Sequence, residues 1–147
     1  MTTYSFLEVN AALVGPGGAI NLGQGAAASE EGISIDPTSP INTMTIAADG
    51  TPMQCLGADK SGVVTVTLLK TSPTNAKLSA MYALQTASPA SHGQNTLTVA
   101  LTHLGDVITC QQVAFQKAPS LKYAKEGGTN DWVFDAGIID RTLGGLI

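Results

Sequence analysis

Much of this chain alternates between apolar and polar residues, which is the pattern of strands that are buried on one face. The alternation is clearest in residues 62–70, where Val64, Val66 and Leu68 face one way while Thr65 and Thr67 face the other. The same pattern predicts further strands at residues 4–14, 19–26, 32–36, 95–102, 107–117 and 129–140. In the last of these strands, the inward positions are Trp132, Phe134, Ala136 and Ile138.

One segment follows a helical period instead. Leu78, Met81, Tyr82 and Gln85 fall on one side of a helix, and alanines fill many of the positions between them. We predict one helix over about residues 73–86. Ser72 is placed to cap it, and Pro73 would occupy the first turn, where a missing N–H costs nothing.

Glycine-rich segments mark the corners between strands. The stretch VGPGGAINLGQG, residues 14–25, has five glycines but no following Lys-Ser or Lys-Thr pair, which a phosphate-binding loop requires. We therefore interpret it as a hairpin corner. A second ribbon spans residues 41–56 and bends at Asp49-Gly50, a dipeptide that favours two-residue hairpin turns.

Together these elements predict a mainly β fold: an antiparallel β-sandwich or barrel-like structure with one flanking helix, in a single domain of residues 1–147. Such a sheet has open edges, which pair readily with other chains. Few prolines or strand charges protect these edges here.

The low content of charged residues suits a surface that neighbours cover, and it equally suits a threonine-rich β-surface that faces solvent. Charged residues make up 12% of the chain, about half of the ~25% typical of a soluble domain. The net charge is −4, and the only loose basic group is Lys117, Lys122 and Lys125, so tight binding of nucleic acid is disfavoured. The first residues, MTTYSFLEVN, do not resemble a secretory leader, and no apolar run approaches ~20 residues. We expect folding in a cytoplasm and no membrane segment.

The sequence offers little material for catalysis or for a cofactor. His92 and His103 lie beside turn residues, and neither shows ligand spacing with Cys55 or Cys110. We expect no metal, no cofactor and reduced cysteines, with Cys110 in the core. Asp131 and Asp135 lie about 13 Å apart along a strand, too far for a retaining glycosidase pair. The threonine-rich faces are most simply polar, half-exposed sheet surfaces, and in a rolled sheet they could line a bore; they comprise Thr65, Thr67, Thr96, Thr98 and Thr102.

Nearly the whole chain resembles a known family. The segments that carry the likeness include YSFLEVNAALVGPGGAINLGQGA, EEGISID, NTMTIAADGTPM, KSGVVTVTLLKTSPTNAKLSAMYALQ, GQNTLTV and QVAFQKAPSLKYAKEGGTNDWVFDAGIID. In this order they resemble the tail tube proteins of contractile-tailed bacteriophages, which are related to the inner tubes of pyocins and type VI secretion systems. The likeness implies a structural virion protein without catalytic residues.

The resemblance also implies partners. Family members form hexameric rings that stack into a hollow tube inside a contractile sheath, and DNA passes through the lumen without specific binding. The other expected partners are the sheath, baseplate, tape measure and tail terminator proteins. The alternatives are the inner tube of a bacteriocin or of a type VI secretion-like system, and a free-standing β-sandwich that binds sugar or protein.

Two sets of residues become candidates on this basis. The ribbon of residues 42–61, with Asp49, Gly50, Met53 and Cys55, is our hypothesis for the contact between rings, and removal of residues 48–58 should abolish polymerisation. Tyr4–Phe6 and the apolar tail are second candidates. The residues expected to face the lumen are Asp131, Asp135, Thr65 and Thr67.

Overall fold

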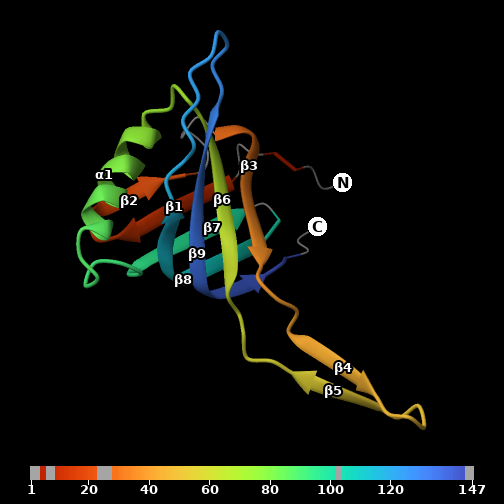
Figure 1. Cartoon of the computed structure of the whole chain (residues 1–147). Coiled ribbons are helices and arrows are strands. Elements are labelled where there is room, and N and C mark those ends of the chain that lie inside the picture. Colours follow the sequence, from red (N-terminus) through yellow and green to blue (C-terminus); the bar gives the residue numbers. More distant parts are fainter. Residues whose placement is uncertain (1–3, 6–8, 23–27, 102–103, 145–147) are drawn as a thin grey trace.

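Figure 1 shows the protein as a computed structural model of the chain. The structure describes residues 4–5, 9–22, 28–101 and 104–144, and for residues 28–31 it describes the backbone alone. The elements are β1 (Val9–Gly15), β2 (Gly18–Asn21), β3 (Ala28–Pro37), β4 (Asn42–Ile46), β5 (Pro52–Leu56), β6 (Gly62–Leu69), α1 (Thr74–Thr86), β7 (Asn95–Leu101), β8 (Asp106–Lys117) and β9 (Thr129–Thr142).

Seven strands form one antiparallel sheet in the order β2-β1-β7-β8-β9-β6-β3, and β4 and β5 form a separate hairpin. Figure 1 shows the sheet folding over itself, so that β9, β6 and β3 cross in front of β2, β1 and β7. The predicted mainly β, antiparallel sandwich-like fold with one flanking helix is confirmed. Because the end strands β2 and β3 are not paired with each other in the described part of the chain, the sheet as described there is not a closed barrel.

The core fills the space between the two halves of the folded sheet. Val64, Val66 and Leu68 are fully buried, as their alternation predicts. Phe115 lies at the centre of an aromatic cluster, with ring centroids 4.8 Å from Phe134, 5.5 Å from Tyr82 and 6.0 Å from Trp132. Edge-on and tilted contacts of this kind add to the gain from burying the rings.

One predicted core position in β9 is wrong. Ile139 is buried, whereas Ile138 is only partly so. The cause is a β-bulge in the neighbouring strand β8, where Gln112 adopts a left-handed conformation with φ of 54°. At this point the inward-facing positions shift by one residue on both strands. Cys110 and Val113 face the core on β8 with two residues between them instead of one, and their β9 partners, Ile139 and Ala136, also face the core.

The helix begins one residue later than predicted. Pro73 is the N-cap rather than a residue of the first turn, and the hydroxyl of Ser72 still accepts a bond from the N–H of Thr74 at 3.3 Å. Leu78, Met81 and Gln85 are buried, as the helical spacing predicts. Among the described residues, no helix has the length and apolar character to cross a membrane.

A buried pair of amides ties α1 to the sheet. Gln85 and Asn95 bond reciprocally at 2.7 and 2.6 Å, and Gln85 Nε2 also donates to the carbonyl of Pro16 at 2.9 Å. Pro16 lies in the turn between β1 and β2, where Gly17 has φ of 106°. The glycine-rich stretch therefore begins as a hairpin corner, as predicted, and α1 packs against it. Its last residues, 23–25, lie outside the described residues.

Candidate assembly surfaces

The β4–β5 hairpin projects far from the body of the molecule (Figure 1). All ten residues of its two strands are exposed, although several of them are large and apolar. The exposed fraction is 55% for Met44, 53% for Ile46, 56% for Met53 and 83% for Leu56. An isolated two-stranded hairpin is marginally stable at best in water. Within the described chain, the hairpin leaves these large apolar side chains exposed.

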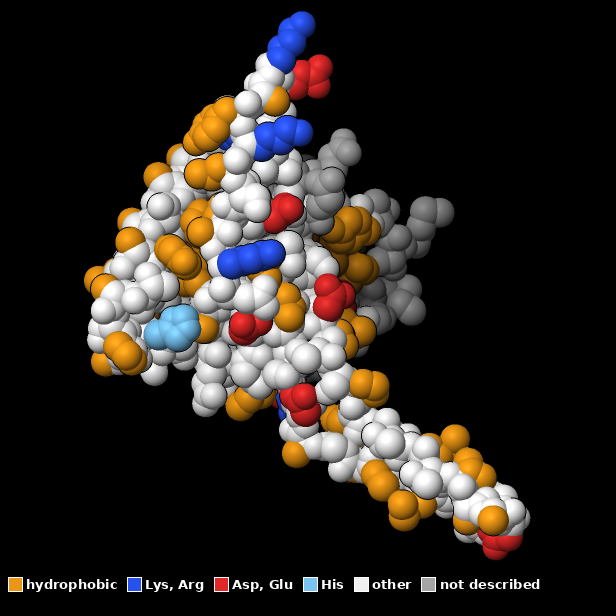
Figure 2. Space-filling view, in the orientation of Figure 1, with side chains coloured by type: hydrophobic (Ala, Val, Ile, Leu, Met, Phe, Trp, Pro, Cys, Tyr) orange, Lys and Arg blue, Asp and Glu red, His pale blue; other side chains and the backbone are white. Residues whose placement is uncertain are grey.

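The two faces of the hairpin differ. In the hairpin, Ile46 pairs with Pro52 and Asn42 pairs with Leu56. These residues lie on the same face as Met44, and this face is mainly apolar. The opposite face carries Thr43, Thr45, Met53 and Cys55. Neither strand carries a charged residue, and Figure 2 shows hydrophobic side chains along the length of the hairpin.

The hairpin turn differs from the prediction. The N–H of Ala47 donates to the carbonyl of Thr51 at 2.9 Å, and the N–H of Gly50 donates to the carbonyl of Ala47. The loop is therefore three residues long, with Gly50 in the left-handed region at φ of 91°. Hydrogen bonds from Thr51 to the carboxylate of Asp49 lower the pKa of that group.

Two short tethers join the hairpin to the body. The N–H of Thr38 donates to the carbonyl of Ser61 at 3.1 Å, and the N–H of Gly57 donates to the carbonyl of Ile41 at 2.6 Å. The carboxylate of Asp59 accepts hydrogen bonds from Ser39 and Ser61. These bonds lower the pKa of Asp59, and those from Ser61 have the largest effect. A cleft of about 520 Å³ opens beside the tethers, and we call it the hairpin-base cleft; it is lined by Pro37, Ser39, Pro40, Ile41, Asp59, Lys60, Ser61, Ile139, Asp140 and Arg141.

The outer face of β6 and β9 brings three of the four predicted lumen residues together at the surface. Asp131 and Asp135 are exposed, and Thr65 is half-buried opposite Val133. Gln116 Nε2 donates to Asp135 Oδ1 at 2.8 Å. Thr67 pairs with Asp131 but is only 7% exposed, so it is not the half-exposed residue that the alternation predicts.

Other charges share this outer face. Asp36 pairs with Val63 on the β3 side, and Lys117 pairs with Val133 on the β8 side. The face thus carries the carboxylates of Asp36, Asp131 and Asp135 against one ammonium group, and it is acidic overall.

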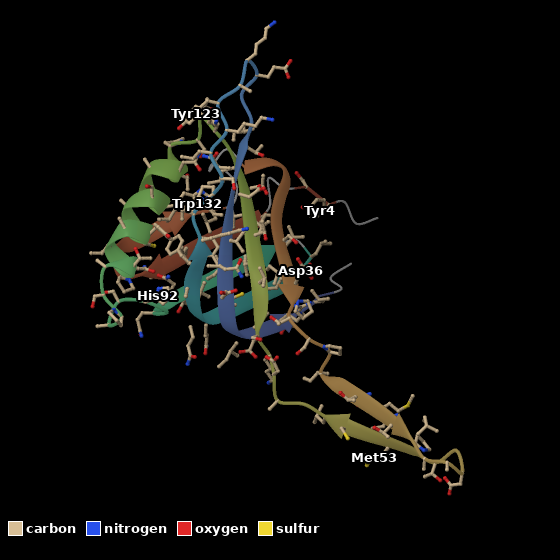
Figure 3. All side chains as sticks on the ribbon, viewed as in Figure 1. Tyr4, Asp36, Met53, His92, Tyr123 and Trp132 are labelled. Carbon is tan, nitrogen blue, oxygen red and sulfur yellow. The ribbon has the colours of Figure 1, made fainter. Side chains whose placement is uncertain are left out.

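The β8–β9 loop, residues 118–128, projects at the opposite end from the hairpin (Figures 1 and 3). It carries Lys122 and Lys125, which the sequence marked only as a loose basic group with Lys117. Tyr123 is 83% exposed and lies under Lys70 Nζ, which is 4.2 Å from the ring centroid. Lys70 Nζ also donates a hydrogen bond to the carbonyl of Lys122. The backbone N–H of Lys70 donates to the carbonyl of Gly128 at 3.0 Å. The loop is therefore held in place from β6.

Both ends of the sheet order are open. Among the described residues, strand β2 pairs only with β1, and β3 pairs only with β6. Unpaired strand edges are templates for pairing with another chain.

The described residues contain no group of three or more His, Cys, Asp or Glu side chains placed to hold a metal ion. Cys55 and Cys110 are free thiols; Cys55 is exposed and Cys110 is buried. Burial raises the pKa of the Cys110 thiol, which favours its neutral form.

His92 is exposed near the end of α1, and His103 lies outside the described residues. Of the second candidates, Tyr4 is exposed, while Phe6 and residues 145–147 also lie outside them.

A family model described as "Bacteriophage PhiTE tail tube protein" matches residues 1–144. A search of curated proteins finds no match.

Solved structures share the fold at low sequence identity. A chain in the tube terminating cap of the anti-feeding prophage is 12% identical, with 98% of this chain and 95% of that chain covered and a TM-score of 0.57. A chain in the extended sheath-tube complex of the extracellular contractile injection system PVC is 12% identical, with coverage of 97% and 99% and a TM-score of 0.54. For the sheath/tube terminator of the same system, the identity is 12%, the coverage is 97% and 98%, and the TM-score is 0.58.

The family model covers almost the whole length of the chain, and the fold is that of chains in contractile injection systems. The chain therefore belongs to the bacteriophage PhiTE tail tube protein family, which makes it a structural protein of a phage tail tube rather than an enzyme.

Proposed function

We propose that six copies of this chain form a ring, that rings stack into the hollow tail tube inside a contractile sheath, and that the genome passes through this tube into the host. The observation that carries the proposal is the match of residues 1–144 to the tail tube family. On this proposal, the protein is assembled in the host cytoplasm and resides in the virion.

The open strand edges support ring formation. Strand β2 lies at one end of the sheet order and β3 at the other, so each copy offers two different edges. Contact between unlike edges is heterologous, and a rotation that closes gives a cyclic ring in which no edge is left unpaired.

The β4–β5 hairpin supports contact beyond the body of one copy. Its strands are uncharged, carry several large apolar side chains and are exposed along their whole length, and no part of the described chain covers them. We propose that the hairpin, including Asp49, Gly50, Met53 and Cys55, packs against copies in the adjacent ring. Obligate interfaces of this kind bury on the order of 2,000–5,000 Å².

The outer face of β6 and β9 is our candidate for the lumen wall. An acidic, threonine-bearing surface repels phosphates, so a DNA chain would slide past it without the counterion release that drives binding. Asp131, Asp135 and Thr65 provide that surface, whereas the buried Thr67 adds little to it.

The same geometry suits the tube of a phage-derived injection system. The solved structures with this fold come from an anti-feeding prophage and from an extracellular contractile injection system. Sheath, baseplate, tape measure and terminator partners are expected in either case. Capsid and terminase genes next to this gene would favour the phage, and their absence would favour the injection system.

Electron cryo-microscopy of the purified chain tests the proposal. We expect tubes with sixfold symmetry in which β2 of one copy lies next to β3 of the neighbour. Alkylation gives a second readout, because assembly should protect Cys55, while Cys110 stays unreactive in monomer and tube. A chain that remained monomeric at high concentration, with Cys55 freely reactive, would contradict the proposal.

A further inference from the structure

The edge of the sheet at β3 carries apolar side chains that its own chain covers only in part. Ile33 and Ile35 pair with Val66 and Val64 of β6, which are fully buried, so both isoleucines lie on the core side of the sheet. They pack against the core, yet they stay half-buried, because no described strand lies beyond β3. Together they form an apolar ridge along this edge.

The edge at β2 is hollow instead. A groove of about 370 Å³ opens between this strand and α1, and we call it the α1–β2 groove; its lining includes Gly17, Ile20, Lys77, Ala80, Met81 and Leu84. Leu84 is 50% exposed, although it is large and apolar. Lys77 is the single charged residue of the lining, and its long side chain can keep the ammonium group in solvent. Figure 1 shows α1 and β2 on one side of the body and β3 on the other.

The pleat of the sheet determines which side chains a further strand would bring to this groove. Side chains at paired positions of neighbouring strands point to the same face. Ile20 pairs with Leu13, and both are buried, so Ile20 marks the core side of β2 and also borders the groove. A strand added to the outer edge of β2 would therefore place its own core-side residues beside Ile20 and next to α1.

One phase of β3 suits the groove better than the other. With Ile33 and Ile35 in line with Ile20, apolar side chains meet an apolar lining, and Asp36 points to the outer face of the sheet. A shift of one residue would turn Ser34 and Asp36 into the groove and both isoleucines to the outer face. That arrangement would bury a carboxylate among apolar side chains, which is costly, and it would leave the isoleucines uncovered.

We propose that the α1–β2 groove of one copy receives Ile33 and Ile35 of the next copy in the same ring, and that Leu84 covers them. Helix α1 is then part of the contact between neighbours, and the groove fixes the register in which β3 pairs with β2. This inference rests on the proposed ring closure through β2 and β3, and it names the side chains that hold that closure together.

A bulky side chain in the groove tests the contact. Ala80 is exposed and lines the groove, whereas Ala83 is exposed on the same helix outside the lining. Ala80→Trp should raise the critical concentration for tube formation about tenfold, because overfilling a packed contact weakens it by at least that factor. The matched control Ala83→Trp should leave that concentration unchanged. Both variants should unfold at the wild-type midpoint as dilute, unassembled protein.

Disulfide formation tests the register, and it does not depend on the tryptophan variant. In a Cys55→Ser background, Leu84→Cys with Ile35→Cys should give cross-linked species up to the hexamer in oxidised tubes but not in dispersed protein. Leu84→Cys with Asp36→Cys is the matched control, since Asp36 lies next to Ile35 but points to the opposite face. This second pair should give no cross-links.

The outcomes separate the inference from the proposed function. Tubes in which the Leu84→Cys and Ile35→Cys pair does not cross-link, or in which the Asp36→Cys pair links instead, would overturn the inference alone. Assembly of a folded Ala80→Trp variant at the wild-type concentration would do the same. Wild-type protein that forms no rings would overturn the proposed function and this inference together.

Discussion

Gly15 and Asn95 show how one residue position constrains another that is distant in sequence. A Cβ atom on Gly15 would lie 1.8 Å from Oδ1 of Asn95. The Asn95 side chain cannot move away freely, because Gln85 bonds to both of its polar atoms. The alternating pattern predicts that residues 95–102 form a strand, but it cannot predict this approach, which depends on tertiary packing.

Gly15→Ala should therefore destabilise the protein. The methyl group must displace a buried and fully bonded amide, so we expect a loss of about 1–3 kcal/mol in the free energy of unfolding. Urea denaturation of dilute, unassembled protein measures it. Gly127→Ala is the matched control, because nothing lies within 4 Å of its Cβ, and it should change stability by less than about 0.5 kcal/mol. Equal stability of the two variants would contradict the packing argument.

Where single residues depart from the hydrophobic pattern, the departure has an identifiable cause. Ile138 was expected inside because strict alternation continues through Gly137, but the bulge at Gln112 shifts the phase of both β8 and β9. A left-handed glutamine has no sequence signature, since this conformation is uncommon for such a residue. The turn at Asp49-Gly50 was located correctly, yet whether its loop has two or three residues depends on which backbone groups bond.

At the scale of elements, most of the fold follows from the hydrophobic pattern. Strands β6, β7, β8 and β9 and helix α1 were predicted within a few residues of their bounds. The pattern could not show that β4 and β5 leave the body. A period of two shows which positions are apolar, but it does not show what covers them, and here no part of the described chain does.

Removal of the hairpin should separate folding from assembly. Gly57 bonds to Ile41, so the chain can be joined directly between these residues when Asn42–Leu56 are deleted. We expect an unfolding midpoint close to that of the parent, because the hairpin adds nothing to the core, and no tubes in negative-stain images. Ile46→Thr is a milder variant that keeps β-propensity while it removes exposed apolar area, and it should weaken assembly only in part. Normal tubes from the deletion variant would refute the inter-ring assignment of the hairpin.

At the scale of the whole molecule, the sequence predicted an acidic chain with open edges but not how its charges are distributed. Lys117 was grouped with Lys122 and Lys125 because they are close in sequence. The structure places Lys117 among the carboxylates of the outer face and the other two in the projecting β8–β9 loop. Such a separation depends on where a strand ends, and composition does not report it.

The sign of charge on the lumen wall can be tested in assembled tubes. Asp131→Lys with Asp135→Lys should make tubes that retain linear double-stranded DNA at low salt and release it as salt rises. Wild-type tubes should not retain DNA. Ser79→Lys with Ala83→Lys adds positive charge to the exposed side of α1 and serves as the control. If both variants retained DNA equally, or if a density map placed Asp131 on the outside, the lumen assignment would be wrong.

The tethers of the hairpin have a mechanical consequence. Only two short segments link β4 and β5 to the seven-stranded sheet, and the backbone hydrogen bonds of these segments join Thr38 to Ser61, Gly57 to Ile41 and Ile139 to Lys60. When a filament built from such copies curves, these links would flex before any core deforms, since a packed interior resists compression. The elasticity of the particle would then be set by the segments around Thr38 and Gly57.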